Sequence, residues 1–203
     1  VLSSYKQHKD FQRCQKIQAA LFESYPRDFG KYGKKVNAHN LQAIYQHIPN
    51  VIAQRFIYSH VNADIPIRDL KPALQSLIYA GLVYPLYQTA ASGLPFNATM
   101  NAKKFKLLFL DIGLCKYSSE LDAQIYTEND LVLLDKGTLA EQFVGQELLA
   151  YKENYRQSSL YYWEREKAGS SAEVDFVINV GSKIYPLEVK SGKTGRLKSL
   201  QVF

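Results

Sequence analysis

Apolar residues recur at helical spacing in the first part of the chain and at alternate positions in the last part. Pro26 and Gly81 are expected to end the first and third helical runs, because proline lacks the helical N–H donor and glycine accepts positive φ. We expect helices over residues 1–25, 37–52, 68–79, 137–152 and from 193 onward, a short helical segment over 54–61, and strands over 82–88, 105–110, 159–164, 172–180 and 183–190.

The last two strands form the most informative pattern. Gly181 and Ser182 separate them, and glycine at the first central position suits a tight two-residue hairpin. That turn places Asp175 opposite Glu188, and Glu173 opposite Lys190, all on one face because strand side chains alternate. The other face is then apolar, so a one-residue slip would bury the acids.

This register brings two carboxylates together. Directly opposed side chains lie roughly 4.5–5.5 Å apart at Cβ, where two carboxylates repel unless a cation or proton lies between them. Converging oxygen ligands suit Mg²⁺ or Mn²⁺, so Asp175 and Glu188 are candidate metal ligands. The alternative is an ordinary charged strand face, with Glu173 and Lys190 as a cross-strand ion pair.

Asp175, followed on the next strand by Glu188-Val189-Lys190 and preceded by an acidic helix, resembles the PD-(D/E)XK nuclease superfamily. The resemblance implies that Asp175 and Glu188 bind the metal and that Lys190 assists the attacking water. It also makes Glu141 the helical acid of the site. Glu141 has an alternative role, because Thr138 and Glu141 have the spacing of a capping box.

Further motifs resemble the C-terminal region of prokaryotic AAA+-type ATPases, a region labelled as a domain of unknown function. The stretches that carry this likeness are ALQSLIYAGLV (73–83), KLLFLDIGL (106–114), GTLAEQFVGQELLA (137–150), YYWERE (161–166), EVDFVI (173–178), PLEVKSG (186–192) and SLQVF (199–203). The resemblance implies an upstream ATPase domain in the same polypeptide.

No ATP site is expected within this chain. The run from Ser191 to Thr194, SGKT, looks like the end of a phosphate-binding loop. That loop requires glycine five positions before Gly192, where this chain has Leu187.

The predicted fold is α/β, of α+β type, in three parts. An N-terminal helix and linker cover 1–35, a helical, winged-helix-like module covers 36–114, and a nuclease-like αβββα domain, truncated at its C-terminus, covers 115–203. In winged helices the third helix often enters the major groove, which makes Arg68 and Lys71 candidate DNA-binding residues. Asp111, after a strand, is expected to cap the next helix.

Composition adds little to this picture. The net charge of +6 is compatible with a polyanion such as DNA. No apolar run approaches the roughly 20 residues that span a bilayer, so we expect no membrane partner. Cys14 and Cys115, without metal-binding spacing, favour buried reduced thiols and a cytoplasmic protein.

The leading functional hypothesis is a Mg²⁺-dependent or Mn²⁺-dependent nuclease domain that acts on DNA. A second hypothesis is a catalytically inactive nuclease-like module that binds DNA or protein and regulates the upstream ATPase. A third is a structural oligomerisation or tethering domain. The sequence leaves the oligomeric state open.

Overall fold

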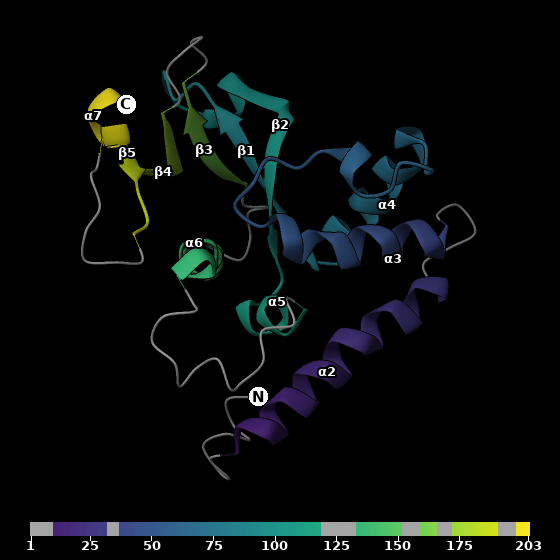
Figure 1. Ribbon diagram of the computed structural model, residues 1–203. Coiled ribbons are helices and arrows are strands. Elements are labelled where there is room, and N and C mark those ends of the chain that lie inside the picture. The colour runs from purple at the N-terminus through teal and green to yellow at the C-terminus, as the bar shows by residue number, and fades with distance from the viewer. Residues whose placement is uncertain (1–9, 32–36, 119–132, 152–158, 166–171, 191–197) are drawn as a thin grey trace. The chain divides into compact units, whose positions relative to one another are not determined.

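The chain folds into helices from its first part and a five-stranded mixed sheet that includes its last strands (Figure 1). This computed structural model describes residues 10–31, 37–118, 133–151, 159–165, 172–190 and 198–203. The helices are α2 (Phe11–Asp28), α3 (Ala38–His47), α4 (Ile67–Tyr79), α5 (Ile112–Ser118), α6 (Leu133–Ala150) and α7 (Lys198–Val202), with 3₁₀ turns η1 (Phe29–Lys31), η2 (Ile48–Val51), η3 (Tyr58–His60) and η4 (Phe96–Thr99). The strands are β1 (Val83–Thr89), β2 (Met100–Phe109), β3 (Leu160–Glu164), β4 (Glu173–Val180) and β5 (Lys183–Leu187).

Most predicted elements are present; the differences lie at their ends and in the segment 54–61. Pro26 lies inside the last turn of α2 instead of ending it. The segment predicted as helical over 54–61 forms only the short turn η3, and Arg55 makes an isolated β-bridge with Lys106. Gly81 follows α4 at a φ of +70°, as expected for a glycine that ends a helix.

The chain divides into two compact units, which we describe separately. The first comprises residues 1–51, 57–83 and 109–134. Its core forms around Tyr45 of α3, which is completely buried and packs against Phe22, Phe29 and Phe109. Asp111 accepts hydrogen bonds from the backbone N–H groups at the start of α5, so the predicted cap is confirmed.

The second unit comprises residues 52–56, 84–108 and 135–203 and contains most of the sheet. The strand order is β2-β1-β3-β4-β5, with β1 parallel to β3 and both neighbours of β4 antiparallel to it. The strands predicted as the ribbon of a winged helix are β1 and β2. They continue the sheet formed by β3–β5, so they are not a separate wing.

The hairpin register is confirmed. Val180 pairs with Lys183 and Phe176 pairs with Leu187, and Gly181 takes a φ of +60° in the turn between them. The ladder ends there, because β5 stops at Leu187. The predicted facing pairs of charged residues therefore lie just beyond the regular part of the hairpin.

A bulge between β3 and β4 changes which side chains share a face. Tyr161 pairs with Val177 and Trp163 pairs with Val174, so both Asp175 and Phe176 lie opposite Tyr162. A bulge adds one residue on one strand and alters the alternation of side chains there. As a result, all four residues from Val174 to Val177 are buried, whereas simple alternation predicts a polar face.

Helix α6 packs closely on this sheet at Gly145. A Cβ at this position would clash with Cδ1 of Leu108 and would lie 3.2 Å from Cζ of Phe176. Both neighbours belong to the buried cluster of the sheet, against which Val144 and Leu148 of α6 also pack. Because Gly145 has no side chain, α6 can approach the sheet this closely.

We expect Gly145→Ala to lower the free energy of unfolding by about 1–3 kcal/mol, because the added methyl group overpacks a buried contact. Gly137→Ala is the matched control in the same helix, where a Cβ would meet nothing within 4 Å. The control should be neutral or stabilising, since alanine favours helices by up to about 1 kcal/mol over glycine. Urea denaturation of both variants measures the difference, and equal stabilities would contradict the packing argument.

Candidate functional site

Asp175 lies at the bulge of β4 and is 9% exposed. Its Oδ2 accepts a hydrogen bond of 2.7 Å from the backbone N–H of Val189, just after β5. Burial raises the pKa of Asp175 above its ordinary value, the Val189 hydrogen bond lowers it, and neighbouring Glu188 raises it again. The hydrogen bond ties the end of the hairpin to the bulge.

Glu188 follows β5, and its side chain is 7% exposed. Its Oε1 accepts a hydrogen bond of 2.5 Å from Nζ of Lys190. Its Oε2 is buried and has no hydrogen-bond partner among the described residues. A buried carboxylate oxygen without a partner is costly, so this atom is a candidate ligand for a cation.

Glu141 projects from α6 and is partly buried. Burial raises its pKa from 4.5 to about 7, with a further increase from the charge of Asp175. The capping-box alternative is wrong, because α6 begins at Leu133 and Thr138 therefore lies inside the helix. The structure thus leaves the Glu141 carboxyl near the other acids.

Sequence analysis missed one member of the cluster, Lys106 of β2. Its side chain is 3% exposed, and its ammonium group forms an ion pair with Glu173 at the start of β4. The same Nζ lies 5.1 Å from the ring centroid of Tyr162, a distance typical of a cation–π contact. The predicted pair of Glu173 with Lys190 is therefore replaced by two pairs, Glu173 with Lys106 and Glu188 with Lys190.

Lys190 is the exposed cation of the group. Its hydrogen bond with Glu188 raises the pKa of the Lys190 ammonium above its ordinary value. Lys190 is therefore protonated at neutral pH. It can stabilise negative charge or orient a water molecule, but it cannot accept a proton.

The structure brings the four predicted catalytic residues together, Glu141, Asp175, Glu188 and Lys190: the charge of Glu188 contributes to the pKa shifts of the other three. Among the residues that the structure describes, no three acids, histidines or cysteines form a ready-made metal cage. Mg²⁺ does not require one, because it is usually held by one or two carboxylates and keeps several waters. Asp175 and Glu188, with an unpartnered oxygen, fit such a site; their roles stay predictions.

The predicted DNA-binding residues lie in the first unit, on α4. Arg68 is 85% exposed at its side chain and lies 3.6 Å from the carboxylate of Asp69, and Lys71 is exposed. A surface ion pair of this kind contributes little to stability. Both side chains are accessible to a polyanion, and their role also stays a prediction.

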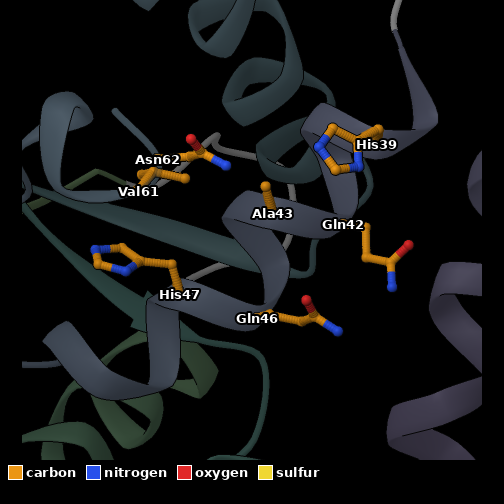
Figure 2. Close-up of a pocket in the computed structure, with 7 residues that line it drawn as sticks. All are labelled: His39, Gln42, Ala43, Gln46, His47, Val61 and Asn62. Carbon is orange, nitrogen blue, oxygen red and sulfur yellow. The ribbon is translucent and has the colours of Figure 1, made fainter. Parts of the chain in front are cut away.

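The first unit also contains a recess of about 390 Å³ along α3 (Figure 2). Its lining combines imidazoles and amides with two small apolar side chains and includes none of the predicted site residues: His39, Gln42, Ala43, Gln46, His47, Val61 and Asn62. Burial lowers the pKa of His47, and neighbouring His60 lowers it further, so this imidazole is neutral at pH 7.

Taken together, the fold and the cluster define a mixed α/β protein with acids and lysines gathered on one sheet. The chain belongs to the DUF8612 family, a domain family of unknown function whose model matches residues 1–125. Residues 136–203 match a second domain of unknown function, DUF4143. No curated protein and no solved structure matches the chain. Lys106 comes from the first match, and the acids of the cluster come from the second.

None of the helices that the structure describes has the length and apolar character needed to cross a membrane. Cys14 and Cys115 are both buried, as expected.

The raised pKa of Glu141 predicts a pH-dependent stability. A carboxyl whose pKa is higher in the folded state does not lower the free energy of unfolding at pH values below its pKa in the unfolded chain, 4.5. As pH rises from 4.5 to about 7, ionisation of this carboxyl destabilises the fold increasingly. We expect Glu141→Gln to remove this pH-dependent destabilisation. Relative to the wild type, the free energy of unfolding of the variant should increase by up to about 3 kcal/mol between pH 4.5 and pH 8. Urea denaturation across this range, without divalent ions, measures the effect.

Glu147→Gln is the control, because it removes the same charge from the same helix. Its stability should follow the wild-type pH dependence. A Glu141→Gln variant that also follows the wild-type curve would rule out the proposed burial of this carboxyl among acids.

Proposed function

We propose that the acid–lysine cluster binds a divalent cation, Mg²⁺ or Mn²⁺, and cleaves phosphodiester bonds in DNA. The observation that carries this proposal is the buried, unpartnered Oε2 of Glu188, in a carboxylate that raises the pKa of Asp175. Two carboxylates near one another and enclosed in protein are unfavourable without a cation. The order of elements supports it further, because a helix, three strands and a helix follow one another from α6 to α7.

The bound ion would polarise a phosphate oxygen and acidify a water molecule. Asp175 and Glu188 would hold it, since both offer carboxylate oxygens at the open end of the hairpin. The Val189 N–H orients the Asp175 carboxylate by a hydrogen bond to Oδ2, and Oδ1 would bind the ion. Lys190 would stabilise the negative charge that develops on the phosphate, because it is protonated and exposed.

Glu141 would contribute as a third acid. Its pKa of about 7 means that a proton is present on much of the population at neutral pH without the ion. A nearby divalent cation favours the ionised form of a carboxyl. Glu141 would therefore ionise as the site fills and complete the oxygen ligands.

The resemblance to the C-terminal region of AAA+-type ATPases supplies the context of this proposal. We place the chain downstream of an ATPase domain in the same cytoplasmic polypeptide, with that domain's nucleotide site outside these residues. The nuclease-like site would then act on DNA that the ATPase engages, and Arg68 and Lys71 would contribute phosphate contacts.

A second candidate function is a nuclease-like module that binds DNA or protein without cleaving it and regulates the ATPase. One observation favours it: Lys190 and Lys106 already neutralise part of the acidic charge through their ion pairs with Glu188 and Glu173. Calorimetric titration with Mg²⁺ separates the two functions. No ion binding, together with retained DNA affinity at low salt, would favour the module.

For the nuclease, we expect Asp175→Asn to reduce Mg²⁺-dependent DNA cleavage by about 100-fold or more, because it removes a ligand charge. Asparagine keeps an oxygen that can accept the Val189 hydrogen bond, so the hairpin end should survive. Lys190→Met should reduce cleavage similarly without weakening ion binding, because it removes a positive charge bonded to the proposed ligand Glu188. A plasmid-nicking assay and calorimetry measure these two effects.

Lys183→Met is the matched control for lost positive charge, because Lys183 is exposed on β5 of the same hairpin. It should cleave as the wild type does. Undiminished cleavage by both Asp175→Asn and Lys190→Met would sink the assignment of the site.

A further inference from the structure

Lys106 is an unusual residue for its position. It lies in β2 among apolar neighbours, and all five residues from Phe105 to Phe109 are buried. The backbone of Arg55 and Phe56 pairs with this part of β2: Arg55 forms a β-bridge with Lys106, and the N–H of Phe56 donates a hydrogen bond of 2.9 Å to the carbonyl of Phe105. Phe56 and Phe105 also stack at 5.6 Å. This otherwise open edge of the sheet is thus covered beside the lysine.

The lysine side chain is directed at the acids. Lys106 and Leu108 are two residues apart in one strand, so they share a face, and Leu108 contacts α6 at Gly145. The ammonium group reaches the ring of Tyr162 and the carboxylate of Glu173. Its positive charge also lowers the pKa of both Glu141 and Asp175.

The cluster contains more carboxylates than ammonium groups. The carboxylates are Glu141, Glu173, Asp175 and Glu188, and the ammonium groups are Lys106 and Lys190. When all are ionised, two negative charges remain, which one divalent cation balances. Glu173 already has a cation, whereas Oε2 of Glu188 has no partner among the described residues.

We propose that the Lys106 ammonium takes the place of a second metal ion on Glu173, so that the cluster binds one divalent cation and not two. This inference rests on the proposed metal site. Lys106 is here a positioning residue: it keeps Glu173 from acting as a ligand and leaves Asp175, Glu188 and Glu141 to hold the single ion. Without Lys106 the ionised cluster would carry three net negative charges, so one divalent ion would leave one charge uncompensated. Glu173 would then be a fourth carboxylate without a cation, free to bind a second ion.

Titration calorimetry of the full chain with MnCl₂ tests this proposal. The wild type should bind one ion per chain, and Lys106→Met should bind two. Methionine has a similar length and is apolar, so it suits a buried position. The double variant Lys106→Met, Glu173→Gln should return to one ion, because it removes the freed carboxylate. A lysine with a merely structural role would produce neither the gain nor its reversal.

Lys103→Met is the matched control, because Lys103 is an exposed lysine in the same strand. It should keep one ion per chain. A Lys106→Met variant that still binds one ion would overturn the proposal, and so would a double variant that binds two. Failure of the wild type to bind any ion would instead overturn the proposed function and this inference with it.

Electron paramagnetic resonance of Mn²⁺ on the wild type keeps the test decisive if Lys106→Met does not fold. We expect the signal of isolated Mn²⁺ at saturating metal. The spectrum of an exchange-coupled Mn²⁺ pair would overturn the proposal without any variant.

Discussion

The ion pair between Lys106 and Glu173 is the interaction on which the site depends. Four carboxylates gather where α6 meets the sheet and the end of the hairpin, and their mutual repulsion would open the cluster if no positive charge were built into it. Lys106 is almost fully buried, and removing an ammonium group from water is costly unless it is paired. The carboxylate of Glu173 and the face of Tyr162 provide that pairing. The lysine therefore stabilises the acids, and the acids make its burial tolerable.

The bulge between β3 and β4 makes this pairing geometrically accessible. In a regular ladder, Glu173 and Asp175 would lie on the face opposite Phe176. With two residues opposite Tyr162, the strand before the bulge is offset from the strand after it, so Glu173 can meet Lys106 on the side where α6 packs. The same offset leaves Asp175 at the bulge, where its carboxylate bonds the chain after β5. The extra residue of the bulge thus allows side chains of β4 to contact β2, the chain after β5 and the side on which α6 packs.

Local sequence signals were sufficient for the hairpin and insufficient for the cluster. Gly181 and Ser182 determine the turn, and alternation then determines every pair from Val180–Lys183 to Phe176–Leu187. Neither signal reveals the bulge, because it depends on how β4 meets β3. Lys106 was detectable in principle: a lysine within the apolar run from Phe105 to Leu110 must either be exposed at an edge or be paired. Its partner is 67 residues away, and short-range patterns do not carry that information.

The same long-range pairing explains why the strands after α4 do not form a wing. A winged helix needs a two-stranded ribbon with its outer edge free, but β1 pairs in parallel with β3 from far along the chain. The first family match ends at residue 125, after α5, and the second begins at residue 136, within α6. Strands from both matched stretches nevertheless hydrogen-bond in one sheet. The site follows the sheet: its buried lysine comes from one stretch and its acids from the other. Residues 52–56 and 84–108 of the first stretch thus belong to the same unit as the second stretch, and the buried cluster requires both.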